Sequence, residues 1–287
     1  MAYTTAPFRI TTQNCRGRNS LEKRSHLLRD LKHGRVSVAM LQETHLKMSL
    51  KSRSYPTSFH STHPTARKVG VAILLANSVQ FTLTDQLADP NGRYLFIKGT
   101  ISQKTYTFAT LYAPNAKQTM FLCKTISKLA LVLGGDFNAP LDPLYDSSVG
   151  HSSILHSAVR TIRKTLRDLR LVDTWRTLHP SDRDYTHYSA IHRRYSHIDY
   201  LLIQQEGVQP LQNAEILPSP WSDHSAVHML LDSPLYRPTR TTWRLNESIL
   251  SDPDVRTQLR EHLHNYFAEN NTEDTSKMTL WYSRDIS

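Results

Sequence analysis

Near the middle of the chain lies the stretch Leu131-Val132-Leu133-Gly134-Gly135-Asp136-Phe137-Asn138-Ala139-Pro140. It begins as an apolar run, which is typical of a strand buried on both faces. Two glycines then allow the backbone to turn closely, and a carboxylate and a carboxamide follow two residues apart. If the strand continues through Phe137, Asp136 and Asn138 point to the same side. Such a pair can hold a metal ion or a water molecule and donate to an anionic oxygen, although a polar loop after an ordinary strand has a similar composition.

The length of 287 residues suffices for one large α/β domain, or for one domain plus an extension. Hydrophobic residues make up 39%, which is enough for a compact domain if strands carry the core. Two cysteines, Cys15 and Cys123, cannot form a disulfide framework, so we expect a reducing compartment. The first residues do not resemble a signal peptide, and no apolar run approaches the roughly 20 residues of a membrane span. We therefore expect a soluble intracellular protein with no membrane partner.

The net charge of +10 is unevenly distributed along the chain. Residues 236–287 hold seven basic and eight acidic side chains, so residues 1–235 hold the other 28 basic and 17 acidic ones, a net charge of +11. A basic globular part beside a balanced segment suggests a polyanionic partner, with nucleic acid as the first candidate. Ordinary solubilising charge is the alternative.

Hydrophobic periodicity predicts an alternation of strands and helices. We expect strands at 8–15, 36–41, 69–75, 79–83, 94–98, 105–111, 196–203 and 225–231. We expect helices at 20–34, 117–128 and 155–169, and no regular structure at 47–68. The helix at 155–169 has an apolar face opposite a basic flank of Arg160, Arg163, Lys164, Arg167 and Arg170. A solvated outer face is the more frequent reason for such a flank, and a DNA-facing helix is the alternative.

The character of the chain changes past Leu235, so we expect one domain at 1–235 and a helical extension or linker at 236–287. Asp252-Pro253 is a favourable helix start. An apolar stripe follows, made of Val255, Leu259, Leu263, Tyr266 and Phe267. A helix of this kind either belongs to an extension within a longer polypeptide or packs back on the domain.

Polar side chains follow the ends of several predicted strands. They are Asn14, Glu43, Tyr112, Asp136 with Asn138, Asp199, and the run Ser222-Asp223-His224. Carboxylates at successive strand ends suit Mg²⁺, which prefers one or two carboxylates together with phosphate and water oxygens. His224 adds an imidazole at the same rim, and Asp199 can orient and charge it. A zinc site is less expected, because the chain has only two cysteines and no His-Glu-x-x-His motif.

Six motifs stand in an order that resembles a known superfamily, the exonuclease–endonuclease–phosphatase superfamily. They are Asn14, Gln42-Glu43-Thr44-His45, Leu111-Tyr112-Ala113-Pro114-Asn115, Gly135-Asp136-Phe137-Asn138, Ser196-His197-Ile198-Asp199-Tyr200 and Ser222-Asp223-His224. The match covers essentially residues 6–232. Within the superfamily the chain looks like the apurinic-type endonuclease domain of a LINE (non-long-terminal-repeat) retrotransposon, with a Tx-like element as the finer placement. The resemblance implies an α/β fold: a four-layer α/β/β/α sandwich of two packed mixed β-sheets with outer helices.

The resemblance also implies roles for individual residues. The metal would be Mg²⁺, with Mn²⁺ as a substitute, and Glu43 would be its principal ligand. Asn14 would lie near the metal and the phosphate, and Asp223 would belong to the metal and hydrogen-bond network. Asp136 would position or deprotonate the attacking water, and Asn138 and Tyr112 would hold the scissile phosphate. His224, oriented by Asp199, would stabilise the transition state. Thr186 and Ser222 match positions that line the DNA groove.

Two departures from the superfamily pattern stand out. Arg16 occupies the position two residues after Asn14 where the superfamily usually has Asp or Asn, which puts a second metal position there in doubt. The segment between Asn115 and Leu131 is also short, which should trim a peripheral helix rather than the site.

A predicted hairpin, Ser189-Ala190-Ile191-His192-Arg193-Arg194-Tyr195, lies before the strand that carries Asp199. Its composition suits DNA recognition, since arginines bind phosphates or guanine edges, and tyrosine and histidine stack or wedge. A solvated hairpin tip is the alternative. LINE endonucleases have a variable hairpin here that contacts DNA, so the resemblance assigns DNA contacts to His192, Arg193, Arg194 and Tyr195.

These observations predict a Mg²⁺-dependent endonuclease that nicks one strand of duplex DNA and leaves a 3′-hydroxyl to prime reverse transcription. The rivals are an abasic-site repair endonuclease or small-substrate phosphatase of the same fold, and a non-catalytic nucleic-acid-binding module. We expect double-stranded DNA as partner, together with the rest of a longer polyprotein that carries reverse transcriptase, and its RNA. Such a protein would be in the nucleus when it acts and in the cytoplasm as a ribonucleoprotein.

Overall fold

The computed structural model describes residues 8–17, 20–45, 51–63, 65, 69–127, 132–150, 155–207, 211–232 and 252–270. Backbone contacts divide the chain into two units, Met1–Thr239 and Arg240–Ser287. The domain boundary expected after residue 235 lies outside the described residues, as do residues 233–251 as a whole. The role of the second unit as a linker stays a prediction.

The first unit contains a six-stranded sheet in the order β13-β14-β1-β2-β4-β3. Its strands are β1 (Phe8–Asn14), β2 (Val38–Gln42), β3 (Thr57–Ser61), β4 (Val71–Leu75), β13 (Leu211–Leu217) and β14 (Ala226–Leu231). β1 and β2 pair in parallel, and every other pair in this sheet is antiparallel. The sheet is therefore mixed, with its one parallel pair at the centre.

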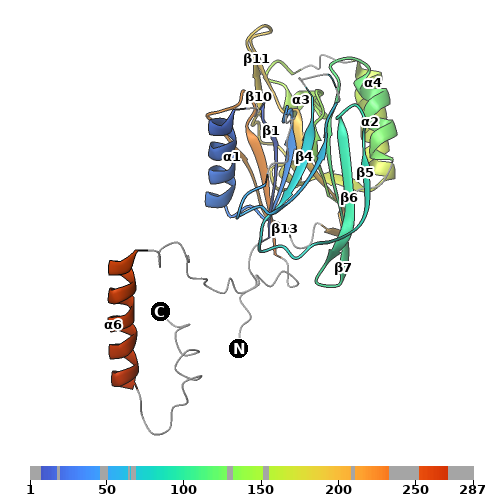
Figure 1. Ribbon diagram of the computed structural model, residues 1–287. Helices are drawn as coiled ribbons and strands as arrows, with labels where there is room; N and C mark the ends of the chain where they lie inside the picture. The colour runs from blue at the N-terminus through green and yellow to red at the C-terminus, as the bar shows by residue number, and fades with distance from the viewer. Residues whose placement is uncertain are drawn as a thin grey trace. The chain divides into compact units, whose positions relative to one another are not determined.

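A second six-stranded sheet has the order β5-β6-β7-β8-β12-β9. Its strands are β5 (Thr82–Ala88), β6 (Tyr94–Ile101), β7 (Lys104–Tyr112), β8 (Val132–Asp136), β9 (Leu171–Asp173) and β12 (Asp199–Gln204). Here β7 and β8 form the central parallel pair. A separate hairpin, β10 (His187–Ser189) with β11 (Arg194–Ser196), projects beyond the two sheets at the top of Figure 1.

The two sheets pack face to face, and helices cover their outer faces (Figure 1). On the first sheet, α1 (Leu21–His33) buries Leu27 and Leu31 against Ala39 and Leu41 of β2. On the second sheet lie α2 (Gln118–Ile126) and α4 (His156–Asp168). Because strand residues alternate in direction, Val38 and Met40 of β2 enter the core between the sheets instead. This arrangement confirms the four-layer α/β/β/α sandwich.

The two glycines of β8 serve the packing of the sheets. Gly134 and Gly135 both lie inside the strand and neither has a positive φ, so the expectation of a close turn at these residues is wrong. A Cβ on Gly134 would meet Met40 Sδ at 2.6 Å, across the interface between the sheets. A Cβ on Gly135 would collide with the carbonyl oxygen of Leu111 on the neighbouring strand. Glycine is required here because other chain segments approach the strand closely.

Two stretches depart from the expected secondary structure. The strand expected at 79–83 is observed at Thr82–Ala88, where every residue is exposed, so no alternation of burial marks it. The segment 47–68, expected to be irregular, contains β3, a polar edge strand that is mostly half-buried. Short elements also escaped prediction: α3 (Pro143–Asp146), α5 (Thr174–Leu178), β9, β13 and the 3₁₀ turn Gln205–Gly207.

The second unit contains one described helix, α6 (Pro253–Asn270). It begins at the expected Asp252-Pro253 start, and Val255, Leu259 and Leu263 are half-buried along one stripe. The side chains of Tyr266 and Phe267 lie outside the described residues. Among the described residues, no helix is both long enough and apolar enough to cross a membrane.

Candidate active site

The polar strand ends of both sheets meet at one rim of the sandwich. In the first sheet, parallel pairing places Asn14 opposite Gln42, one residue before Glu43. In the second sheet, Tyr112 pairs with Asp136 in parallel, and Asp199 pairs with Asp136 from the other side. The strand register alone therefore sets Tyr112, Asp136 and Asp199 side by side.

Asn14 connects the two sheets through its side-chain amide. Its Nδ2 donates to Glu43 Oε1 at 3.0 Å and to Asp136 Oδ2 at 2.9 Å. Its Oδ1 accepts the backbone N–H of Arg16 at 3.0 Å. Asn14 is fully buried, and all three contacts hold its amide in one orientation. The residue therefore fixes the spacing between the two carboxylates.

His224 lies between two buried carboxylates. Its Nδ1 is 2.8 Å from Asp199 Oδ2, and its Nε2 is 4.0 Å from Asp136 Oδ2. Burial opposes a charge on the imidazole, but the charge of Asp199 and its hydrogen bond outweigh burial and raise the pKa of His224 to about 10. The ring is therefore a cation at neutral pH. It points that charge towards Asp136.

Asp136 is a buried carboxylate at the end of β8. Burial, followed by the negative charge of Asp199, raises the pKa of Asp136 well above its usual value, against the opposing charge of His224. The backbone turns directly after it: Asn138 has φ 50°, and its N–H donates to Asp136 Oδ1 at 2.8 Å. Asn138 Nδ2 donates to the carbonyl oxygen of Ala113 at 2.7 Å. The strand does not continue through Phe137, so a turn rather than strand alternation brings these two side chains together.

Glu43 is an ionised carboxylate with access to solvent. Burial raises its pKa, but hydrogen bonds from His45, Asn14 and Tyr112 outweigh burial, and the pKa of Glu43 falls to about 2. Its side chain is 21% exposed. Burial and the neighbouring Glu43 charge raise the pKa of Tyr112 well above its usual value, so Tyr112 keeps its proton and can donate it in a hydrogen bond.

The acidic and histidine groups fit a divalent cation in part. Asp136, Asp199 and His224 offer ligand atoms within 4.8 Å of one another. His224 Nδ1 is already engaged by Asp199, and its raised pKa favours the protonated ring, which cannot bind a metal. Glu43 is the better ligand, because its carboxylate is ionised and partly open.

Asp223 and Ser222 lie on the loop before β14. Asp223 Oδ2 is 3.1 Å from Arg16 Nη1, so Arg16 holds this carboxylate in an ion pair. Ser222 donates to the carbonyl oxygen of Asn14 at 2.7 Å and accepts the N–H of His224 at 3.1 Å. Ser222 thus connects the loop to β1, and Asp223 reaches the site edge rather than its centre.

With this geometry the sequence can be placed among known proteins. Residues 11–224 match the Endonuclease/Exonuclease/phosphatase family. The chain belongs to this family.

One protein similar in sequence is a transposon protein. The chain is 28% identical over 266 residues to the "Transposon TX1 uncharacterized 149 kDa protein" of Xenopus laevis. This similarity covers 88% of the chain but 20% of the relative, so the chain spans about one fifth of that larger protein.

Two solved structures share the fold. The AP endonuclease LMAP from Leishmania major superposes with a TM-score of 0.65 at 16% identity, covering 79% of this chain and 88% of that one. The endonuclease domain of TRAS1, a telomere-specific non-LTR retrotransposon, superposes with a TM-score of 0.60 at 17% identity, covering 81% of this chain and all of that one. Family and fold together support a nuclease.

The side chain of Thr186, which the family resemblance assigned to the DNA groove, is buried in the structure. Thr186 is 1% exposed, and its Oγ1 accepts the backbone N–H groups of Ile198 at 3.1 Å and Asp199 at 3.2 Å. A side chain with these partners cannot face an open groove. It positions the strand start that carries Asp199.

The hairpin expected to read DNA is largely open to solvent. Ile191 at its tip is 90% exposed and Tyr195 is 52% exposed, while His192 and Arg193 are exposed and Arg194 is half-buried. Tyr195 packs against Tyr188, with ring centroids 4.6 Å apart, and against Tyr185 at 6.0 Å. These aromatic contacts lie at the base of the hairpin, and its tip is exposed. Its contacts with DNA stay a prediction.

Two further residues at the rim were not foreseen from the sequence. The carbonyl oxygen of Arg93 accepts the backbone N–H of Tyr112 at 2.7 Å. The Arg93 guanidinium lies 5.3 Å from the centroid of the Tyr112 ring. His187 packs on His224 with ring centroids 4.4 Å apart. Neither residue stands in any of the six motifs, so nothing in the sequence indicated them.

Proposed function

We propose that this domain is a divalent-metal-dependent endonuclease that nicks one strand of duplex DNA. The observation that carries the proposal is a continuous chain of contacts between the polar side chains at the rim. A cationic His224 lies between Asp199 and Asp136, and Asn14 joins Asp136 to the ionised Glu43. A proton acceptor, a positive charge and a metal-binding carboxylate thus face one position where a phosphate group can sit.

The residues divide the work of phosphodiester hydrolysis. Asp136 accepts a proton from the water molecule that attacks phosphorus, and its raised pKa suits a general base near neutral pH. The bond from phosphorus to the 3′-oxygen breaks, and the departing oxygen takes up a proton from solvent. The products are a 3′-hydroxyl and a 5′-phosphate. His224 stabilises the negative charge that develops on the phosphoryl oxygens, and Tyr112 and Asn138 donate to the same group.

A divalent cation, Mg²⁺ or Mn²⁺, supplies Lewis-acid stabilisation of the phosphate when it is bound. Glu43 would hold it, with Asn14 next to it. The carboxylate of Asp223 is engaged in an ion pair with Arg16, which favours one metal position rather than two. Asp223 would then act through its ion pair and not as a free ligand.

DNA as substrate is supported by charge and by the relatives. The net charge of +11 on residues 1–235 attracts a polyanion. The chain resembles a transposon protein in sequence and a retrotransposon endonuclease in fold. In that context the 3′-hydroxyl left by the nick would prime reverse transcription by another part of a longer polyprotein, which would carry the element's RNA into the nucleus.

The experiment that tests this proposal is nicking of supercoiled plasmid. With Mg²⁺, wild-type protein should convert the plasmid to open circles whose nicks a DNA polymerase can extend, and EDTA should stop the reaction. Asp136→Ala should be inactive. Nicks that no polymerase extends would contradict the 3′-hydroxyl, and a plasmid left intact with every divalent metal would refute the activity.

An abasic-site endonuclease is a second candidate, because an AP endonuclease shares the fold. Paired duplexes with and without one abasic analogue separate the two activities. A retrotransposon-type nuclease should cut the intact duplex at a rate comparable to that of the abasic one. Cleavage confined to the abasic duplex would favour repair.

A further inference from the structure

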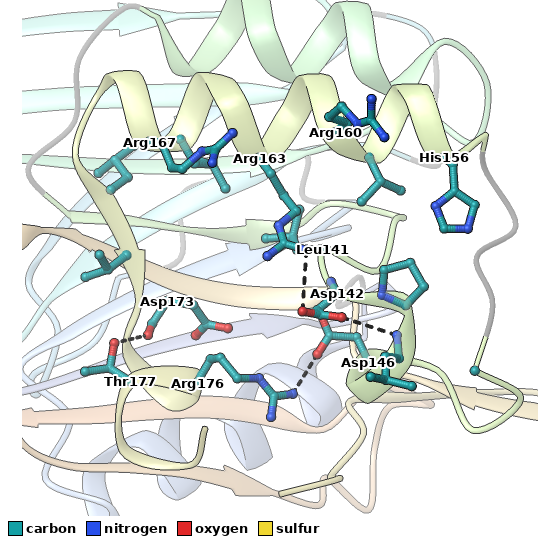
Figure 2. A pocket seen from close by; sticks show the side chains of 17 residues that line it. Leu141, Asp142, Asp146, His156, Arg160, Arg163, Arg167, Asp173, Arg176 and Thr177 are labelled. Carbon is teal, nitrogen blue, oxygen red and sulfur yellow. Dashed lines mark hydrogen bonds and ion pairs between the residues drawn. The ribbon is translucent and has the colours of Figure 1, made fainter. Parts of the chain in front are cut away.

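A pocket of about 690 Å³ lies outside the catalytic group, where α3, α4 and α5 meet (Figure 2). Three arginines of α4 line it, namely Arg160, Arg163 and Arg167, and Arg176 of α5 lines the opposite wall. Asp142, Asp146 and Asp173 lie below them. None of the residues that line this pocket belongs to the catalytic group described above.

The arginines of α4 share one helix face. Val159, Ile162 and Leu166 occupy the buried face, so the spacing of Arg160, Arg163 and Arg167 places them together at the pocket. Arg163 has one acidic neighbour, Asp142, at 3.5 Å. Within the described part of the chain, Arg160 and Arg167 form no ion pair. Like charges three and four residues apart destabilise a helix, so this face is suited to an external anion.

The carboxylates of the pocket are already engaged. Asp146 is 2% exposed and accepts from Arg176 Nη2 at 2.7 Å, from Tyr200 Oη at 3.0 Å and from the N–H of Asp142 at 2.8 Å. Asp173 caps α5 through the N–H of Trp175, and burial raises the pKa of Asp173. Arg176 Nε is buried and has no hydrogen-bond partner among the described residues. The side chains of the pocket that remain without an ion-pair partner in the described part of the chain therefore include the positive charges of Arg160 and Arg167.

The pocket adjoins the base of the β10–β11 hairpin. The carbonyl oxygen of Asp146 accepts the N–H of His197 at 2.8 Å, and Ser147 forms a β-bridge with Ser196. Ser148 exchanges two hydrogen bonds with the backbone of Tyr195. This segment therefore contacts the hairpin on one side, and on the other side Asp142, the N-cap of α3, forms an ion pair with Arg163 of α4. Figure 1 shows α3 between the hairpin and α4.

We propose that this pocket binds backbone phosphates of the target DNA beyond the hairpin, outside the nicked position. A duplex that crosses the rim and passes the hairpin continues over α3 towards Arg160 and Arg167. Guanidinium groups bind phosphates in a bidentate fork. This inference rests on the proposed nicking activity, because it names a flank of the same substrate.

The test compares two variants with the same change in charge. Arg160→Gln/Arg167→Gln removes the unpaired arginines of the pocket, and Lys32→Gln/Lys104→Gln removes two exposed lysines elsewhere. Binding of duplexes is measured over a range of salt concentrations, with each duplex extended stepwise on one side of a mapped nick. For extended duplexes, the slope of log K against log salt is negative. In the arginine variant it should become less steep, by about 0.9 for each phosphate that the variant no longer neutralises.

On the shortest duplexes that are still nicked, the arginine variant should match wild type in binding and in rate. The lysine variant should match wild type in its dependence on duplex length. Equal length dependence in both variants would overturn the pocket assignment while wild-type nicking still stood. Loss of binding to single-stranded RNA with duplex binding unchanged would also overturn it, in favour of an RNA site. Thermal melting of both variants checks that each is folded.

Discussion

Nδ1 of His224 lies 2.8 Å from Oδ2 of Asp199, and both side chains are buried between the ends of the two sheets. This pair gives His224 its charge, because burial alone would lower the pKa of the imidazole. The charge in turn faces Asp136, which must lose its proton to act as a base. The two groups therefore set opposite limits on activity as pH changes.

The first prediction concerns those pH limits. The nicking rate should rise with pH as Asp136 ionises, above the usual range for an aspartate, and should fall as His224 loses its proton near pH 10. Asp199→Asn removes the charge that raises the pKa of His224, so the alkaline limb should move to lower pH. The measurement is a pH–rate profile at saturating DNA. An alkaline limb that stays in place would show that His224 is not the titrating group.

The second prediction separates the base from the metal ligand. Asp136→Asn should lower the nicking rate by about 10²–10⁴ with DNA binding nearly intact, since a general base acts in the transition state. Glu43→Gln should in addition raise the Mg²⁺ concentration needed for half-maximal rate. Asp85→Asn, an exposed change on β5, is the control. If both variants nick at the wild-type rate, the assignment of these residues is wrong.

The third prediction concerns Thr186 as a positioning residue. Thr186→Val removes the acceptor of two buried N–H groups and should cost about 1–3 kcal/mol for each group left unpaired. Thr186→Ser keeps the hydroxyl and should stay near wild type. Urea unfolding measures the stability, and the pH–rate profile of Thr186→Val should shift if Asp199 moves. Equal stability of the two variants would assign Thr186 no such role.

The fourth prediction concerns sequence preference. Replacing residues 190–195 with Gly and Ser should change which sites on a plasmid are nicked, because the exposed hairpin tip carries no catalytic group. Arg193→Ala/Arg194→Ala should do so in part. Nick sites are mapped on one plasmid for each variant and for wild type. Unchanged site patterns at equal rates would leave specificity to the shape and deformability of DNA.

The sequence predicted which side chains gather at the rim better than it predicted what surrounds them; their catalytic roles stay a prediction. Asn14, Asp136 and His224 could be chosen because each follows or precedes an apolar strand, and strand ends of one sheet meet at an edge. The hydrogen bond from Asn14 to Asp136 spans 122 residues and joins different sheets, so no local pattern reports it. The order of the motifs, through family resemblance, supplied that link.

Other features left no trace in local patterns. β5 was expected too early in the chain because all its residues are exposed, and burial alternation is what marks a strand. Thr186 was assigned to the DNA groove through the family resemblance alone, and nothing in its polar segment indicated that it is buried. The pocket at α4 depends on three helices that only the fold brings together. The basic flank of α4 could be identified from the sequence, whereas the α3 and α5 residues that complete the pocket could not.

Two hydrogen bonds at the rim cross from one side of the sandwich to the other. Asn14 ends β1 of the first sheet and His224 lies on the loop that leads into β14 of that sheet, while their partners Asp136 and Asp199 belong to β8 and β12 of the second. The thickness of the sandwich therefore sets the catalytic distances, and Gly134 against Met40 is one of the contacts that set this thickness. A core side chain deep between the sheets can thus act as a spacer for the chemistry. A change at such a core position would alter the distances between the rim side chains without replacing any of them.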